Sequence, residues 1–215
     1  MSVTDCIDIA NRRGVRPGVI VDVGARFGHE TLALAEAYPD AAVHAIEANR
    51  DSSIKLRANT RRAANVHCHR FAAHFETGEA NFCIASRRNP GASSLFEPLN
   101  EDYPHYIRIR KQRTVPAKRL DDWAVSEGID RIDLAWMDLQ GAELFALIGM
   151  GHLLEKCSVI GVELCDKPIY AGQPLRTAVD RFLVSHWFWK MHEERVNEWF
   201  SNAVYANGGR QYGTE

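Results

Sequence analysis

V-D-V-G-A-R-F-G, the stretch from Val21 to Gly28, decides the fold of this chain. An apolar β-branched run leads into it, and a helix-like segment with Leu32 and Leu34 follows. A strand, a glycine turn and a helix in this order open a nucleotide-binding α/β sheet. We expect Gly24, which tolerates backbone angles that side chains disfavour, to let a ligand approach the main chain. We therefore expect Gly24→Val to block the ligand without unfolding the domain, and Gly28 to let the helix start close to the strand.

A second signal is Glu47, which ends the apolar run at 42–46. An acidic residue about 20 residues beyond the glycine loop, at the end of the second strand, binds the ribose hydroxyls in such sheets. The glycine spacing is Gly24-x-x-x-Gly28 rather than G-x-G-x-x-G, and Asp22 precedes the loop. An acidic group here disfavours a pyrophosphate and favours a cationic ligand. S-adenosylmethionine carries an ammonium and a sulfonium and no phosphate, so the loop favours this methyl donor over a nicotinamide dinucleotide.

The composition is that of a single globular domain over 1–215, with a leading segment at 1–17 and a flexible tail at 208–215. The net charge is −2, and no apolar run approaches the ~20 residues that span a bilayer. The five cysteines are scattered without a C-x-x-C pair, and no signal-peptide pattern opens the chain. We therefore expect a cytoplasmic protein without a membrane partner.

Strand and helix patterns alternate along most of the chain. We predict strands at 19–23, 42–47, 65–73, 132–138, 159–164, 188–193 and 203–207, and helices at 4–13, 30–38, 49–64, 120–127, 141–150 and 175–186. Two further strands at 80–85 and 107–115, separated by a loop at 87–104, predict an added β-hairpin insertion. The prediction is an α/β fold with a Rossmann-like, mostly parallel seven-stranded sheet and helices on both faces.

Several candidate site residues fall at predicted strand ends, which share one edge of a parallel sheet: Asp22, Glu47, Ala72, Asp138 and Glu163. Asp138 can orient a hydroxyl, accept its proton or bind the donor's ammonium. Glu163 faces the acceptor side, or forms an ion pair with an arginine. Gln140 suits the adenine or methionine end of the donor. For Glu143 two interpretations remain, a functional role and a helix cap.

Other segments leave alternatives open. The small polar loop with Ser93 and Ser94 either closes over the donor or is a surface turn. His29 either accepts a proton or caps its helix. The basic run at 108–113 is either a charged edge strand or a patch for an anionic acceptor, such as a phosphorylated or nucleotide-linked sugar. We expect no metal site, although two carboxylates on adjacent strand ends have the chemistry to bind Mg²⁺. The histidines at 67, 69 and 74 lack a matched acid.

The chain resembles the FkbM-type methyltransferases, a branch of the S-adenosylmethionine-dependent enzymes with the class I methyltransferase fold. The resemblance covers nearly the whole chain from about residue 19 to 207. It is carried by V-D-V-G-A-R-F-G (Val21–Gly28), I-E-A-N (Ile46–Asn49), R-L-D-D-W (Arg119–Trp123), I-D-L-A-W-M-D-L-Q-G-A-E-L (Ile132–Leu144), G-V-E-L (Gly161–Leu164) and F-L-V-S-H-W-F (Phe182–Phe188). The R-L-D-D-W and D-L-Q-G-A-E motifs are the more specific ones.

The resemblance implies O-methylation of a hydroxyl on a sugar or natural product, with S-adenosylmethionine as cofactor. The acceptor is then a small molecule or a glycan. The sequence departs from the family pattern at two positions. The family often carries Asn where Arg26 stands and Glu where Gln140 stands. A guanidinium would then meet the donor's carboxylate. The expected donor-binding residues are Asp22, Gly24, Ala25, Arg26, Gly28, Thr31, Glu47, Ala48, Asn49, Ala72, Ser93, Ser94, Asp138 and Gln140, and the expected catalytic residues are Asp138, Glu163 and His29.

Two other functions are weighed against this one. A nicotinamide-dependent oxidoreductase is disfavoured by the loop spacing and by the lack of a Tyr-x-x-x-Lys pair. A non-catalytic donor-binding or interaction domain of the same fold is the other alternative. Nucleic acid is not an expected partner, because no aromatic residues interleave the basic run and no N-P-P-Y-like segment follows the fourth strand. The oligomeric state is left open.

Overall fold

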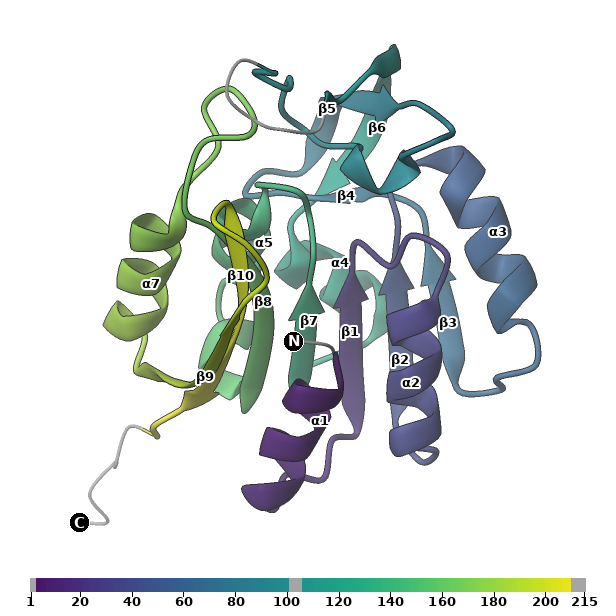
Figure 1. The fold of residues 1–215 in the computed structure, drawn as a ribbon. Coiled ribbons are helices and arrows are strands. Elements are labelled where there is room, and N and C mark those ends of the chain that lie inside the picture. Colours follow the sequence, from purple (N-terminus) through teal and green to yellow (C-terminus); the bar gives the residue numbers. More distant parts are fainter. Residues whose placement is uncertain (1–2, 101–105, 210–215) are drawn as a thin grey trace.

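A seven-stranded sheet forms the centre of the protein, seen in a computed structural model that describes residues 3–100 and 106–209 (Figure 1). Its strand order is β3-β2-β1-β7-β8-β10-β9. The strands are β1 (Val19–Val23), β2 (Ala42–Ile46), β3 (Val66–His69), β7 (Leu134–Met137), β8 (Val159–Cys165), β9 (Phe188–Arg195) and β10 (Phe200–Asn207). All neighbouring strands are parallel except β10, which runs antiparallel to β8 and β9. The predicted mostly parallel sheet is confirmed.

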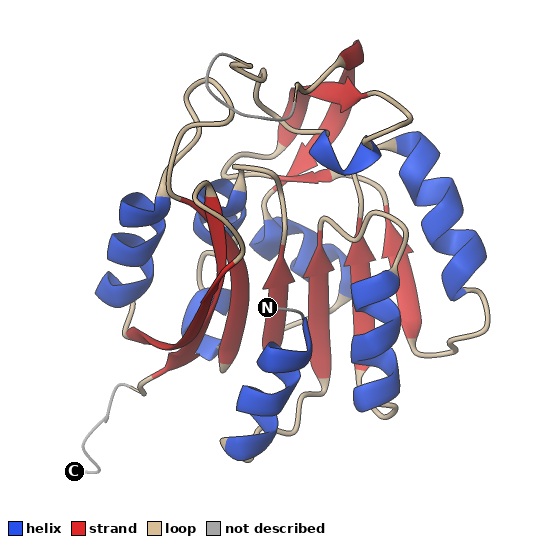
Figure 2. Cartoon of the chain, viewed as in Figure 1, coloured by secondary structure: helices blue, strands red, loops and turns tan. Residues whose placement is uncertain are grey.

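Helices cover both faces of this sheet (Figure 2). They are α1 (Val3–Arg12), α2 (His29–Ala37), α3 (Arg50–Thr60), α4 (Leu120–Glu127), α5 (Glu143–Gly149), α6 (Leu153–Lys156) and α7 (Arg176–Ser185). Successive strand residues point to opposite faces, so Ile20 packs with Leu34 of α2 while Val21 shares a core with Trp123 of α4 and Leu183 of α7. Burying both faces explains why the central strands read as continuous apolar runs. No described helix is long and apolar enough to cross a membrane.

The added hairpin lies over the carboxyl ends of the central strands (Figure 1). Strand β5 (Gly78–Ala85) pairs antiparallel with β6 (Ile109–Lys118), as predicted. The single strand predicted at 65–73 is wrong in its second half. The chain leaves the main sheet after β3, and β4 (Ala72–Ala73) pairs with β6 instead, which makes a second, three-stranded sheet. The loop between β5 and β6 contains the 3₁₀ turn η1 (Pro90–Ala92), while residues 101–105 of that loop and 210–215 of the tail lie outside the described residues.

The glycine loop packs against the chain that leaves β7. Gly24 has φ +91°, and a Cβ atom there would lie 1.9 Å from the carbonyl oxygen of Asp138. The amide of Asp138 donates to the carbonyl of Val23 at 3.0 Å, which holds the two loops together. The missing side chain therefore makes room for protein backbone, and the expectation that Gly24→Val leaves the fold intact is wrong. Gly28 similarly makes room for α3, since a Cβ there would lie 2.7 Å from Leu56 Cδ1.

Gly24→Ala should lower the free energy of unfolding by about 2 kcal/mol or more, from backbone strain at positive φ and from overpacking. Urea unfolding followed by circular dichroism measures this. Gly78→Ala is the matched control, because no atom lies within 4 Å of its added Cβ. Equal stability of the two variants would contradict the packing described for the glycine loop.

Candidate active site

A pocket of about 290 Å³ opens at the carboxyl ends of β1, β2, β7 and β8, beneath η1 and the second sheet. Ten of the residues predicted for the site line it: Asp22, Gly24, Arg26, Glu47, Ala48, Ala72, Ser93, Asp138, Gln140 and Glu163. Apolar side chains, among them Phe71, Phe82 and Leu139, complete its walls. A cleft that combines apolar walls with convergent polar groups is typical of a small-molecule site.

Six predicted site residues do not line the pocket: Ala25, Gly28, His29, Thr31, Asn49 and Ser94. Thr31 is buried and donates a hydrogen bond to the carboxylate of Asp22. The side chain of Asn49 caps α3 by accepting from the amide of Asp51 at 3.0 Å. His29 is exposed at the first position of α2. Thr31 and Asn49 thus hold pocket-lining segments in place, and a direct ligand contact by any of the six stays a prediction.

Glu47 follows β2 and is held by backbone amides on both sides. Its Oε2 accepts from the amide of Arg26 at 2.8 Å, and its Oε1 accepts from the amide of Asn49 at 2.6 Å. Burial raises the pKa of Glu47 to about 7, although the two amides oppose the shift. Arg26 takes the left-handed conformation with φ 47°, which side chains rarely adopt and which clusters at functional sites.

Asp22 lies on β1, with its side chain almost fully buried. Burial raises its pKa to about 7, and the hydrogen bond from Thr31 partly opposes this. A buried carboxylate of this kind is stabilised in its charged form by any cation that enters the pocket. Asp22 and Glu47 together therefore favour a positively charged ligand over a pyrophosphate.

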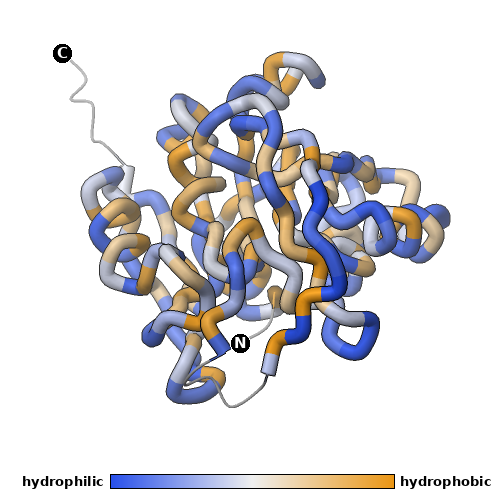
Figure 3. Tube along the Cα trace, turned by 90° about the horizontal axis from the view of Figure 1, so that it is seen from above, coloured by the Kyte–Doolittle hydropathy of each residue, from blue (hydrophilic) through white to orange (hydrophobic). Residues whose placement is uncertain are grey.

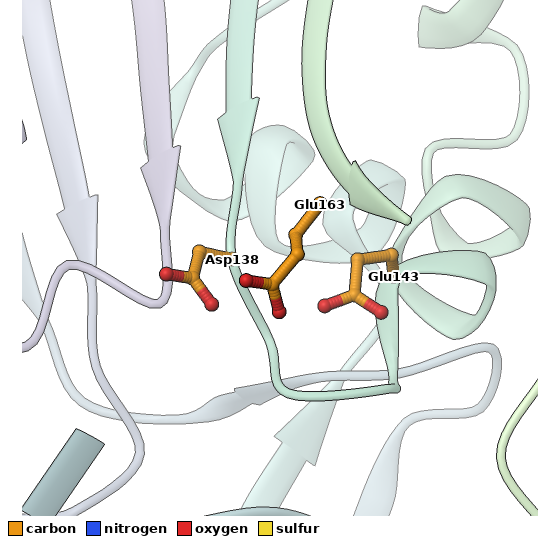
Figure 4. A group of neighbouring side chains, drawn as sticks. All are labelled: Asp138, Glu143 and Glu163. Atoms are coloured by element: carbon orange, nitrogen blue, oxygen red, sulfur yellow. The ribbon is translucent and has the colours of Figure 1, made fainter. Parts of the chain in front are cut away.

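Three carboxylates converge beside the pocket, where β7 and β8 end (Figure 4). One oxygen each from Asp138, Glu143 and Glu163 lie within 4.8 Å of one another. Burial raises the pKa of Glu143 to about 7. Burial, and then the charges of Asp138 and Glu143, raise the pKa of Glu163 well above its ordinary value. Asp138 is the exposed member of the three.

Glu143 serves the loop between β7 and α5. Its Oε1 accepts from the amide of Leu139 at 2.8 Å and from the amide of Gly141 at 3.2 Å. From the first turn of α5, Glu143 thus organises this loop, and a functional role for it stays a prediction. This carboxylate does not line the pocket.

Gln140 joins the other two carboxylates. Its Nε2 donates to Asp138 Oδ1 at 2.7 Å and to Glu163 Oε2 at 3.2 Å, and the hydroxyl of Tyr170 lies 3.2 Å from its Oε1. The hydroxyl of Ser94 donates to its carbonyl at 2.8 Å. Gln140 holds this position with φ 53°, a left-handed conformation. A neutral amide here reduces the repulsion between two acids and fixes their orientation.

Carboxylate oxygens are ligands that Mg²⁺ prefers, so the chemistry of the three acids permits a cation. Among the described residues, no other group of three His, Cys, Asp or Glu side chains lies close enough to share one. The histidines at 67, 69 and 74 are thus not arranged as a metal site. In this structure the acids meet protein N–H groups of Leu139, Gln140 and Gly141. The metal-free site stays a prediction.

Sequence reasoning missed Tyr170 and Glu30, which both line the pocket. Tyr170 lies 30 residues beyond Gln140, and its hydroxyl also approaches the carbonyl of Ala92 at 3.1 Å. No local pattern marks such a residue, because three separate segments meet there. Glu30 had a usable signal, as it is the acidic residue in the first turn of α2.

A family model described as a methyltransferase FkbM domain matches residues 22–200. The chain belongs to the FkbM methyltransferase family. The 2-O-methyltransferase NoeI of Sinorhizobium fredii (strain NBRC 101917 / NGR234) is 28% identical over 170 residues, which cover 75% of this chain and 70% of NoeI.

Solved structures of methyltransferases share the fold of this FkbM domain. M. capricolum TrmK in complex with S-adenosylhomocysteine aligns with a TM-score of 0.54 and 10% identity, covering 96% of this chain and 67% of TrmK. The N-terminal domain of EvdMO1 with S-adenosylhomocysteine bound aligns with a TM-score of 0.53 and 12% identity, covering 95% of this chain and 79% of that domain. At such identities the likeness concerns the fold alone, and it confirms the predicted class I methyltransferase fold.

The raised pKa of Glu143 predicts a pH dependence of stability. A protonated Glu143 favours the folded state, so its contribution is complete below the ordinary pKa of 4.5 and is lost as the pH rises through about 7. Glu143→Gln keeps an acceptor for both amides and cannot ionise. Relative to wild type, this variant should gain on the order of 1–3 kcal/mol of stability between pH 5 and pH 8.

Urea unfolding at several pH values measures the effect, and Glu155→Gln, an exposed position on α6, is the control. If the difference in the free energy of unfolding between Glu143→Gln and wild type stays constant from pH 5 to pH 8, ionisation of Glu143 does not destabilise the folded state. That result would contradict a raised pKa for Glu143.

Proposed function

We propose that this FkbM domain is an S-adenosylmethionine-dependent O-methyltransferase that acts on a hydroxyl group of a sugar or natural product. The observation that carries the proposal is the acid pair Asp138 and Glu163, joined by Gln140 where the pocket meets β7 and β8. Family membership and the similarity to NoeI, whose name states 2-O-methylation, support the choice of oxygen as the methylated atom.

The residues of the pocket fit the donor. S-adenosylmethionine, when bound, supplies a methyl group made electrophilic by a sulfonium. Each oxygen of Glu47 retains a lone pair beyond its amide partner, which suits it to accept from ribose hydroxyls. The exposed carboxylate of Asp138 suits an ammonium group, and the guanidinium of Arg26 suits a carboxylate. This charge pattern is unfavourable to the pyrophosphate of a nicotinamide dinucleotide, which is the second candidate cofactor.

Glu163 is the group we assign to the acceptor. A carboxylate with a raised pKa takes up a proton near neutral pH more readily than an ordinary one, which is what a general base requires. Gln140 fixes its orientation, and Asp138 is the alternative base. His29 ranks third because it does not line the pocket. With the base and the donor both held, the acceptor oxygen needs only alignment with the methyl carbon, and alignment supplies much of the rate.

Replacing Glu47 should weaken donor binding. Glu47→Ala should reduce the affinity for S-adenosylhomocysteine by roughly 1.5–3 kcal/mol, the scale of hydrogen bonds to a charged group. Isothermal titration calorimetry measures this, with NADP as a second titrant that should not bind. Glu36→Ala, exposed on α2, should behave as wild type. Binding of NADP in preference to S-adenosylhomocysteine would overturn the proposed function.

The two acids of the pair should separate donor binding from chemistry. Glu163→Gln should keep the affinity for S-adenosylhomocysteine and lower turnover by ~10²–10⁴-fold, as expected for a lost general base. Asp138→Asn should lose donor affinity as well. Steady-state methylation of an acceptor found by screening, combined with calorimetry, checks both. A chelator should leave wild-type activity intact. Activity that falls with chelator and returns with Mg²⁺ would instead make both acids metal ligands.

A further inference from the structure

The charges of this chain are unevenly distributed. Residues 50–119 contain fourteen Lys and Arg and six Asp and Glu, a net charge of +8, so the remaining residues carry −10 of the total of −2. This basic part comprises α3, β3, the second sheet and the loop that contains η1. The second sheet and this loop lie over the carboxyl ends of the central strands, while α3 lies beside β3 (Figure 1). In the view from above, hydrophilic and hydrophobic stretches are mixed along the chain (Figure 3).

Three exposed arginines of this part adjoin the pocket: Arg87, Arg88 and Arg108. Arg87 and Arg88 immediately precede the segment 89–93, all of which lines the pocket, and Arg108 follows the lining residue Ile107. The amide of Ser86 donates to the carbonyl of Arg108 at 2.8 Å, so the two segments run side by side. The backbones of these arginines therefore lie close to one another and next to residues that line the pocket.

Within 3–100 and 106–209, no carboxylate pairs with any of these three arginines. Arg110, two residues beyond Arg108 and within β6, does pair with Asp51 at 3.2 Å. Protection of an edge strand does not account for Arg87 and Arg88, because they stand in a loop rather than on a strand. Unpaired guanidinium groups are the side chains best suited to bind a phosphate in bidentate fashion.

We propose that Arg87, Arg88 and Arg108 select acceptors that carry a phosphate group, so that the methylated hydroxyl belongs to a sugar phosphate or a nucleotide-linked sugar. This inference rests on the proposed function. In it, the acidic end of the pocket binds the methyl donor and the acceptor's hydroxyl, and the basic rim binds the acceptor's phosphate. A sugar phosphate and a nucleotide-linked sugar both present a phosphate to these arginines. They differ in whether a nucleoside adds to the binding affinity.

Calorimetry on protein saturated with S-adenosylhomocysteine tests the proposal with four probes: glucose, glucose 1-phosphate, UDP-glucose and a short single-stranded RNA. Glucose 1-phosphate or UDP-glucose should bind at least tenfold more tightly than glucose. A preference for UDP-glucose identifies the nucleotide-linked class, and equal affinities identify the phosphate alone. The double variant Arg87→Gln/Arg88→Gln should lose at least fivefold in affinity for the phosphorylated sugars and keep its affinity for S-adenosylhomocysteine.

The control is Arg61→Gln/Arg62→Gln, which removes the same charge from exposed positions just beyond the far end of α3. It should bind the phosphorylated sugars as wild type does. Equal losses in the two double variants, or no preference for phosphorylated over neutral sugar, would overturn the proposal, as would tighter binding of RNA than of either sugar. Failure to bind S-adenosylhomocysteine at the outset would count against the proposed function instead.

Discussion

The contact between the glycine loop and the backbone of Asp138 determines the rest of the site. Two loops that leave adjacent parallel strands approach so closely that a single Cβ at Gly24 would overlap a carbonyl oxygen. The hydrogen bond from the amide of Asp138 to Val23 fixes their spacing. Because Glu47 in turn accepts from the amide of Arg26 in the same glycine loop, the ends of β1, β2 and β7 form one rigid edge.

Buried carboxylates are the main electrostatic cost of this edge. Burial raises the pKa of Asp22, Glu47 and Glu143 to about 7, which means that each charged form is disfavoured by the surrounding protein. Backbone amides lower this cost for Glu47 and Glu143, and the side-chain amide of Gln140 lowers it for Glu163, without removing it. A cation inside such a site stabilises the charged carboxylates, which connects the energetics of the fold to a cationic ligand.

The second sheet gives the pocket its other wall. The hydroxyl of Ser94 donates to the carbonyl of Gln140, and Tyr170 approaches both Gln140 and Ala92, so the insertion is joined to the end of β7 by side chains rather than by a strand ladder. The pocket-lining residues of the insertion therefore lie on a part of the chain whose sequence can change without disturbing the parallel sheet. Differences in acceptor among domains of this fold have a structural basis in that separation.

The sequence by itself determined the parallel sheet and the strand ends where Asp22, Glu47, Asp138 and Glu163 lie, because hydrophobic periodicity and a glycine turn are local signals. It also indicated the hairpin at 80–85 and 107–115. Only the tertiary structure decided that residues 72–73 leave the main sheet for β6, since pairing depends on which distant strand offers a free edge. Only it could bring Tyr170 to Gln140, bring Glu143 to the loop amides, and show that a side chain at Gly24 would meet the backbone of Asp138. Those outcomes depend on which segments meet in space, and periodicity within one segment carries no information about that.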